Sequence, residues 1–213
     1  MNKKRVHSCL FPSFGDFEDE VSVSVFFSGC NMRCRMCFNA NVVVEPPRMS
    51  VEDVFEFVKA QVPLATAVVL LGGEPLIHPV EVLEEFLRRS RDLGLKTKLF
   101  TNGTFYEKLV RLMPLLDRVS LDVKHRLNLE CYRRVSPLFT QEMLDNIIQS
   151  AEFLRRHHPH RCEFRITVCK PIHTCEDLES LRKTFPSLIV QDYVSTDSQL
   201  FKDHLELEVL RCN

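Results

Sequence analysis

Glycine is scarce in this chain. Six glycines occur in 213 residues, where an average usage of about 7% would give roughly fifteen. Because glycine permits tight turns and lets the backbone approach a ligand closely, its retained positions are informative. Four of the six follow apolar, strand-like runs, at Gly29, Gly72, Gly73 and Gly103. We infer that several strands end where the backbone turns sharply or lies against a ligand.

The chain also lacks an excess of charge and a long apolar run. Lys and Arg number 28 against 29 Asp and Glu, so no net field favours nucleic acid or an acidic membrane surface. The basic segment 1–8 is not followed by the apolar stretch of a secretion signal, and no membrane span is predicted. Nine cysteines without such a signal indicate a reducing compartment, where clustered cysteines more often bind metal than form disulfides. We expect a cytoplasmic protein.

No repeat, low-complexity segment or linker divides the sequence, and strand-like and helix-like segments alternate instead. The predicted strands are 21–27, 67–71, 95–100, 118–124, 162–168 and 187–194, with a further edge strand at 205–211. The predicted helices are 51–62, 80–93, 105–113, 141–157 and 175–184. This alternation is typical of a parallel sheet covered by helices. Since a full (β/α) barrel needs eight units, six predict an α/β fold of the open, partial (β/α)6 TIM-like barrel type.

Polar residues collect where the predicted strands end. Ligands of parallel α/β folds bind at the carboxyl ends of the strands. Alternation along the strand sequence places Ser120, Asp122 and Lys124 on one face, and it places Arg165 and Thr167 together in the same way. Polar groups in apolar strands are costly unless they pair or meet a ligand. We therefore expect these strand ends to face one shared cavity.

Three cysteines lie in one short segment, FFSGCNMRCRMCFN, directly after the first predicted strand. Iron–sulfur clusters are held by cysteine thiolates, normally four for a [4Fe–4S] centre. A loop that supplies only Cys30, Cys34 and Cys37 would leave one iron open to a ligand, as catalytic metal sites do. The alternative is a structural Cys₃His zinc site completed by His78 or His125. A closed zinc site leaves the glycines and charges at the strand ends unexplained.

The segment CNMRCRMC has the C-x-x-x-C-x-x-C spacing of the radical S-adenosylmethionine superfamily, and GGEP resembles the methionine-binding segment of that superfamily. The order VSVFFSGCNMRC, LLGGEPL, TNG, LDVK and FRITV is most similar to glycyl-radical-enzyme activases of the anaerobic ribonucleoside-triphosphate reductase activating type. The resemblance covers residues 21–193. It implies a lead-in at 1–20, a radical S-adenosylmethionine core domain at 21–195 and a C-terminal extension at 196–213.

The resemblance implies two cofactors and a set of residues that bind them. A [4Fe–4S] cluster would be held by Cys30, Cys34 and Cys37, with S-adenosylmethionine on its fourth iron. Reduction would cleave S-adenosylmethionine to methionine and a 5′-deoxyadenosyl radical, with the protein orienting the reactants. The protein residues implied in binding S-adenosylmethionine are Gly72, Gly73 and Glu74 for the amino group, Lys124 for the carboxylate, and Asn102, Asp122 and Arg165 for the rest of the pocket.

The resemblance also implies protein partners. A glycyl radical enzyme, such as anaerobic ribonucleotide reductase, would receive the radical on a backbone glycine, and a reduced flavodoxin- or ferredoxin-type protein would donate the electron. No nucleic-acid or membrane partner is implied. Two alternatives stay open: an enzyme acting on a small molecule, similar to 7-carboxy-7-deazaguanine synthase through its TNGT segment, and a zinc- or cluster-binding protein without catalysis.

Three residues depart from the pattern of the superfamily, and they lie on the adenosine side of the expected pocket. Met36 stands where an aromatic residue is usual, Phe38 where His or Gln is frequent, and Phe100 where activases commonly have Asp. The remaining cysteines follow no compact ligand spacing, so we expect buried thiols rather than an auxiliary cluster from Cys131, Cys162, Cys169, Cys175 and Cys212. Cys9 is expected to be an ordinary thiol.

Overall fold

The computed structural model describes residues 3–195, 201 and 205–212 of the chain. Its contacts divide it into two compact units. The first unit comprises residues 1–30, 42–101 and 107–119, and the second comprises 31–41, 102–106 and 120–213. We describe each unit by itself, within the described residues.

The first unit is built on a sheet whose strand order is β3-β1-β2-β4-β5. These strands are β1 (Lys4–Ser13), β2 (Ser22–Phe27), β3 (Met49–Ser50), β4 (Ala67–Gly72) and β5 (Lys96–Thr101). β2, β4 and β5 run parallel, whereas β1 runs antiparallel to both β2 and β3. Every residue from Ala67 to Leu71 is buried, as expected of a parallel strand that is covered on both faces.

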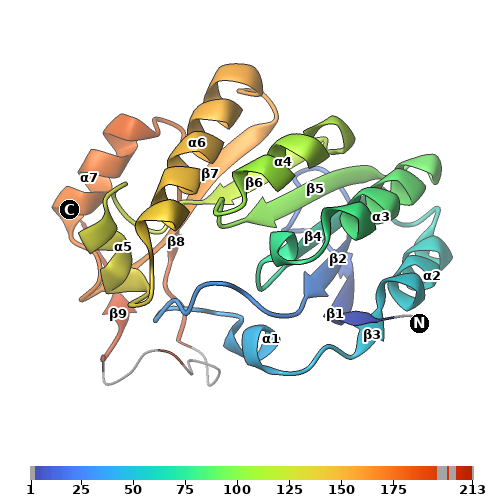
Figure 1. The fold of residues 1–213 in the computed structure, drawn as a ribbon, viewed down its shortest axis with the longest axis horizontal. Helices are drawn as coiled ribbons and strands as arrows, with labels where there is room; N and C mark the ends of the chain where they lie inside the picture. The colour runs from blue at the N-terminus through green and yellow to red at the C-terminus, as the bar shows by residue number, and fades with distance from the viewer. Residues whose placement is uncertain (1–2, 196–200, 202–204, 213) are drawn as a thin grey trace. The chain divides into compact units, whose positions relative to one another are not determined.

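Helices α2 (Val51–Gln61) and α3 (Val80–Asp92) lie side by side against the strands of the first unit (Figure 1). Ser50 begins α2 with a capping box, in which its hydroxyl accepts the Asp53 amide and the Asp53 carboxylate accepts the Ser50 amide. Gly94, at φ +82°, follows the end of α3. The short elements are α1 (Ala40–Val44), η1 (Pro75–Ile77), α4 (Tyr106–Leu112) and η2 (Met113–Leu115).

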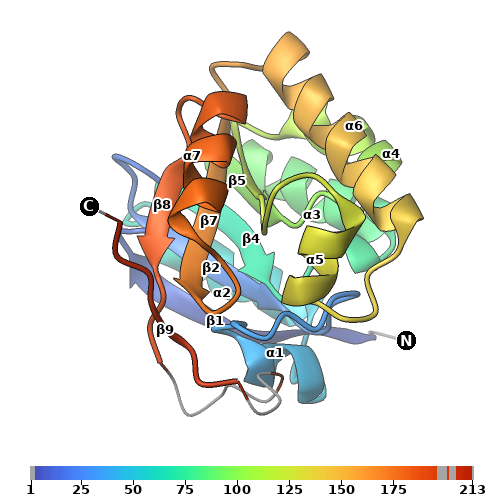
Figure 2. The same cartoon turned by 90° about the vertical axis from the view of Figure 1, so that its left-hand side faces the viewer.

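The second unit contains the strand order β6-β7-β8, with β9 paired antiparallel to β7. The strands are β6 (Arg118–Asp122, which begins in the first unit), β7 (Cys162–Lys170), β8 (Ile189–Asp192) and β9 (Glu208–Val209). The helices are α5 (Leu129–Val135), α6 (Gln141–His157) and α7 (Cys175–Thr184). Figure 2 shows α7 beside β7 and β8. Phe164 of β7 packs against Phe185 at the end of α7, with ring centroids 4.6 Å apart.

The predicted α/β class with a mostly parallel, open sheet is confirmed, since the strand order is linear and not closed among the described residues. The predicted helices at 141–157 and 175–184 match α6 and α7 to the residue. The sequence patterns gave no sign of β1, α1 or α5. β1 has an irregular burial pattern because it is a bulged strand, and α5 is only seven residues long. No described helix is both long and apolar enough to span a membrane.

The expectation that the scattered cysteines are all thiols is wrong for one pair. Cys175, the first residue of α7, forms a disulfide with Cys212, 37 residues further along the chain. The two lie close because β9 returns to β7 just before the chain reaches Cys212, a proximity that sequence spacing does not reveal. Cys131 and Cys169 are buried thiols as predicted, while Cys9 and Cys162 are half-buried thiols.

The disulfide predicts a thiol count. Titration of the denatured, metal-free and unreduced chain should find the seven thiols that remain outside the Cys175–Cys212 bond. Cys212→Ser should lower the free energy of unfolding by about 2–4 kcal/mol, because the unfolded chain gains freedom when the crosslink is lost. Cys162→Ser is the matched control and should lower the thiol count by one with little loss of stability. Nine thiols in the wild type would contradict the pairing.

Candidate functional site

Gly72 and Gly73 press against the end of β2 in the first unit. The Gly73 amide donates to the Phe27 carbonyl at 3.0 Å, and the Glu74 amide donates to the Gly29 carbonyl at 2.8 Å. A Cβ at Gly73 would lie 1.8 Å from the Gly29 oxygen, and Gly72 adopts φ +119°. Both positions therefore require glycine, one for space and the other for its backbone angle. The sequence inference that strand ends keep glycine for close backbone approach holds here.

Glu74 is fully buried immediately after these glycines. Its Oε1 accepts the Leu76 amide at 3.0 Å and the Thr101 hydroxyl at 2.9 Å. The first bond caps η1, and the second joins the end of β4 to the end of β5. Glu74 is thus a buried carboxylate whose position is fixed by neighbours within the first unit.

The cysteine loop contains the last residue assigned to the first unit, Cys30, and continues into the second unit with Cys34 and Cys37. All three thiols are half-buried, and the Cys37 amide donates to the Cys34 carbonyl at 3.0 Å in a tight turn. Burial raises the pKa of the Cys37 thiol, and the nearby Lys124 ammonium partly offsets that effect. No three His, Cys, Asp or Glu side chains among the described residues are gathered closely enough to hold a metal ion.

Lys124 and Asp122 form an ion pair at the end of β6 in the second unit, with Nζ 3.0 Å from Oδ2. Burial lowers the pKa of the Lys124 ammonium, but the Asp122 carboxylate and the neighbouring Cys34 outweigh burial and raise the pKa above its ordinary value. Lys124 is therefore a fixed positive charge beside Cys34 and Cys37. This arrangement suits both a thiolate ligand set and an anionic group of a substrate.

Asn102 is joined to the cysteine loop. Its Nδ2 donates to Asn31 Oδ1 at 2.9 Å, and its Oδ1 accepts the Thr104 hydroxyl at 2.6 Å. Asn31 Nδ2 in turn donates to Thr104 Oγ1 at 2.8 Å. Sequence reasoning missed Asn31 and Thr104, although each directly adjoins a predicted motif. These bonds hold the residue that follows Cys30 against the TNGT turn within the second unit.

Two polar residues lie within the strands of the second unit: Ser120, which is buried, and Arg165, which is half-buried. Arg165 Nη1 lies 3.4 Å from Glu163 Oε1, and its backbone carbonyl accepts the Val123 amide at 2.8 Å. The Ser120 hydroxyl is buried and makes no hydrogen bond within the described part of the chain. A buried hydroxyl without a partner costs free energy, so its retention is consistent with a ligand or water on the Asp122 face of β6.

Two of the three departures from the superfamily pattern, Met36 and Phe100, pack against apolar clusters of their own units. Met36 is 6% exposed and packs in an apolar cluster with Val135 and Tyr193 of the second unit. Phe100 packs against a cluster of the first unit that includes Phe17, and the Lys98 ammonium lies 4.8 Å from its ring centroid. Phe38, in contrast, is 60% exposed.

The two histidines considered for a zinc site are used elsewhere. His78 Nε2 lies 3.0 Å from the Ser28 carbonyl in the first unit, and His125 Nε2 lies 3.2 Å from the Ile172 carbonyl in the second. Burial lowers the pKa of each imidazole to about 4. Both rings thus serve as neutral hydrogen-bonding groups within their own units.

The profile of the Radical SAM superfamily matches residues 24–184 of this sequence. The matched range contains the cysteine loop, the glycine turn, Asn102, Lys124 and Arg165. The chain belongs to the radical SAM superfamily. Enzymes of this superfamily use a [4Fe–4S] cluster and S-adenosylmethionine, so the predicted cofactors and the predicted enzymatic nature of the chain are confirmed at that level.

Several curated relatives are similar to this radical SAM enzyme. A protein of Methanocaldococcus jannaschii, named as a candidate glycyl-radical enzyme activating enzyme, is 30% identical over 174 residues, which are 79% of this chain and 70% of the relative. The pyruvate formate-lyase-activating enzyme of Listeria monocytogenes is 32% identical over 147 residues, which are 62% of this chain and 56% of the relative. The 7-carboxy-7-deazaguanine synthase of Methanopyrus kandleri is 33% identical over 130 residues, covering 52% of each.

Solved structures support the fold. Coproporphyrinogen III oxidase from Escherichia coli, described as a radical SAM enzyme, superposes with a TM-score of 0.58 at 15% identity, over 87% of this chain and 48% of that one. At this identity the likeness concerns the fold alone, which is the partial barrel of radical SAM enzymes. The chain spans about half the length of that structure and of two of the three relatives above.

The kinds of residue present fit the two cofactors, although the three cysteine side chains of the loop are not gathered closely enough in this structure to hold a metal ion. Iron–sulfur clusters are held by cysteine, and the loop supplies three cysteines, of which Cys34 and Cys37 lie near the Lys124 ammonium. The glycine turn leaves no room for a Cβ at Gly73, because the Gly29 carbonyl lies against it. Within the first unit Glu74 offers a buried carboxylate, and within the second unit Lys124 offers an ammonium paired with Asp122.

A substitution tests the glycine turn. Gly73→Ala should destabilise the fold by about 1 to 3 kcal/mol, because its Cβ would overlap the Gly29 carbonyl. Urea unfolding of the cluster-free protein would measure the change. Gly15→Ala is the control, since nothing lies within 4 Å of a Cβ at Gly15. Equal stability of the two variants would contradict the close approach.

The buried histidines predict acid sensitivity. Burial, followed by the neighbouring His173, lowers the pKa of His125 from 6.5 to about 4. Because the unfolded chain binds this proton first, stability is fully present above about pH 6.5 and falls towards pH 4, by up to about 1.4 kcal/mol per histidine and pH unit. Urea unfolding at pH 7 and pH 5 should show a smaller loss in His125→Gln than in the wild type. Equal losses would contradict a neutral, buried His125.

Proposed function

We propose that this radical SAM enzyme is an activase that installs a glycyl radical on a partner enzyme, such as anaerobic ribonucleotide reductase. The observation that carries the proposal is the similarity to the Methanocaldococcus jannaschii relative over 79% of this chain. The similarity to pyruvate formate-lyase-activating enzyme supports the same role. The proposed substrate is therefore a protein, and the proposed electron donor is a reduced flavodoxin- or ferredoxin-type protein.

In this proposal the cluster binds to Cys30, Cys34 and Cys37. When bound, it supplies the electron that cleaves S-adenosylmethionine to methionine and a 5′-deoxyadenosyl radical. The protein contributes charge and orientation.

The glycine turn and Glu74 receive the ammonium group of S-adenosylmethionine, and Lys124 receives its carboxylate through a charge-assisted hydrogen bond. Asp122 keeps Lys124 in place through their 3.0 Å ion pair. Asn102 and Arg165 line the rest of the proposed pocket.

The experiment combines the anaerobically reconstituted, reduced protein with S-adenosylmethionine and a purified anaerobic ribonucleotide reductase. We expect 5′-deoxyadenosine and an electron paramagnetic resonance doublet from a glycyl radical on the reductase. Cys34→Ala should abolish both signals because the cluster loses a ligand. Cys162→Ser, which changes a half-buried thiol outside the loop, should keep both. Formation of 5′-deoxyadenosine without a glycyl radical on this or related glycyl radical enzymes would contradict the activase role.

A second candidate function is synthesis of a small molecule. The similarity to 7-carboxy-7-deazaguanine synthase favours it, as does the TNGT segment at Thr101–Thr104. This candidate requires turnover by the isolated protein, with 7-carboxy-7-deazaguanine as the product detected by mass spectrometry. Product formation without any protein partner would replace the first proposal with the second.

A further inference from the structure

Lys124 is held at three points within the second unit. Its ammonium lies 3.0 Å from Asp122 Oδ2, its amide donates to the Tyr132 hydroxyl oxygen at 3.2 Å, and its carbonyl accepts from His173 Nε2 at 2.9 Å. Tyr132 and His173 thus bind the two sides of the same residue's backbone. The amide and the carbonyl of Lys124 are therefore both satisfied by side chains, one from α5 and one from the loop before α7.

Tyr132 reaches Lys124 from α5. The side chain is fully buried, and its ring packs on Phe139 with centroids 4.7 Å apart. Burial of this ring fixes where the hydroxyl lies, since an aromatic side chain has only two rotatable bonds. The hydroxyl of Tyr132 is therefore a rigid acceptor for the amide of Lys124.

His173 reaches Lys124 from the loop between β7 and α7. Its Nδ1 accepts the Cys169 amide at 3.1 Å. A neutral imidazole that accepts at one nitrogen carries its proton on the other, so Nε2–H of His173 donates to the Lys124 carbonyl. Burial lowers the pKa of His173, which keeps the ring in this neutral form.

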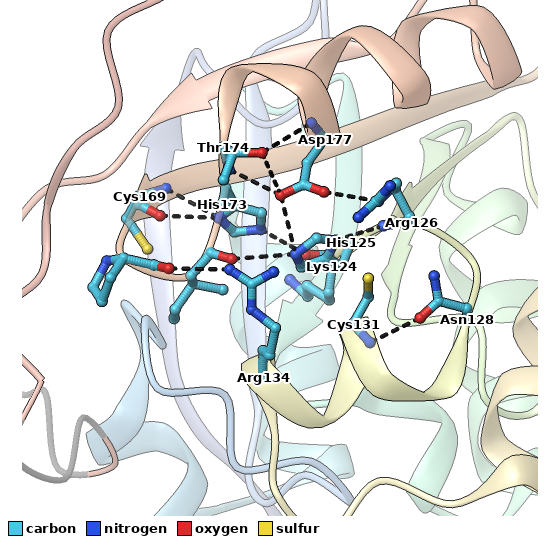
Figure 3. A network of polar contacts seen from close by, with 12 residues as sticks. Lys124, His125, Arg126, Asn128, Cys131, Arg134, Cys169, His173, Thr174 and Asp177 are labelled. Atoms are coloured by element: carbon cyan, nitrogen blue, oxygen red, sulfur yellow. Dashed lines mark hydrogen bonds and ion pairs between the residues drawn. The ribbon is translucent and has the colours of Figure 1, made fainter.

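A second layer of contacts holds His173 in turn (Figure 3). The rings of His125 and His173 lie 4.9 Å apart, and His125 Nε2 is 3.2 Å from the Ile172 carbonyl. Asp177 accepts the amide and hydroxyl of Thr174 at 2.9 Å each and pairs with Arg126 at 2.7 Å. These bonds attach the loop containing His173 to the first turn of α7.

We propose that Tyr132 and His173 are positioning residues that fix the backbone of Lys124 just after β6. They thereby determine how well the enzyme binds the carboxylate of S-adenosylmethionine. The inference rests on the proposed role of Lys124 in the function above. Neither Tyr132 nor His173 needs to touch the ligand, because both act through the backbone of Lys124. Their effect is therefore specific to the carboxylate end of the ligand.

The test measures dissociation constants rather than turnover. Equilibrium dialysis with the cluster-loaded protein compares S-adenosylmethionine with its decarboxylated analogue, which keeps the ammonium and adenosine but lacks the carboxylate. Tyr132→Phe should weaken binding of S-adenosylmethionine about three- to tenfold, since one hydrogen bond to Lys124 is lost, and leave binding of the analogue unchanged. Tyr106→Phe, which removes a hydroxyl outside this network, should change neither constant.

His173 provides the second pair of variants. His173→Leu removes the donor to the Lys124 carbonyl and should weaken binding of S-adenosylmethionine but not of its decarboxylated analogue. His173→Gln keeps a side-chain N–H and should restore part of the affinity for S-adenosylmethionine. If circular dichroism shows that Tyr132→Phe does not fold, the two His173 variants test the inference instead. Equal weakening of both ligands, or no weakening, in folded variants would overturn the inference and assign the network to stability alone.

A Lys124→Met variant separates this inference from the proposed function. The double variant Lys124→Met/Tyr132→Phe should bind S-adenosylmethionine no more weakly than Lys124→Met alone, because the positioning effect needs the lysine. If Lys124→Met weakens both ligands equally, the carboxylate contact and the positioning role are both overturned. The glycyl radical assay is independent of that outcome, so the activase proposal would stand or fall on its own result.

Discussion

The close approach of the Gly72–Gly73 turn to the end of β2 is the constraint on which the first unit depends. The amides of Gly73 and Glu74 bond to carbonyls of Phe27 and Gly29, so the turn after one strand is pinned to the residue that precedes Cys30. A side chain at Gly73 would occupy the position of the Gly29 oxygen. Through this contact, the backbone that begins the cysteine loop and the buried Glu74 carboxylate are set by a single packed turn.

Charge supplies the matching constraint in the second unit. Lys124 stays positive despite being half-buried, because the Asp122 carboxylate and the neighbouring Cys34 stabilise the ammonium. A cation with several partners beside the cysteine loop favours thiolates as ligands and an anionic group as a neighbour. The buried histidines, in contrast, stay neutral and act only as hydrogen-bonding groups. Each unit thus holds one charged side chain in place through its neighbours: Glu74 in the first unit and Lys124 in the second.

Much of the fold was readable from periodicity. Apolar residues recur over enough positions to reveal α6, α7 and the parallel strands. Ser50 and Gly94 indicate helix ends because serine caps helix starts and glycine follows helix ends. β1 and α5 were not readable, because a bulged, half-exposed strand and a seven-residue helix carry weak periodic signals. The partners of Lys124 were equally hidden: Tyr132 lies eight residues away in α5, and His173 lies 49 residues away.

The sequence by itself determined the cysteine spacing, the glycine turn, the alternation of the parallel strands with the longer helices and, through these, the superfamily. Such features depend on neighbours within a few residues, and their chemistry is local. Tertiary structure alone decided that Met36 packs in a core cluster and that Cys175 pairs with Cys212. It also decided that His173 holds Lys124. These contacts join residues far apart in the chain, and their existence follows from how strands and helices pack, which no spacing encodes.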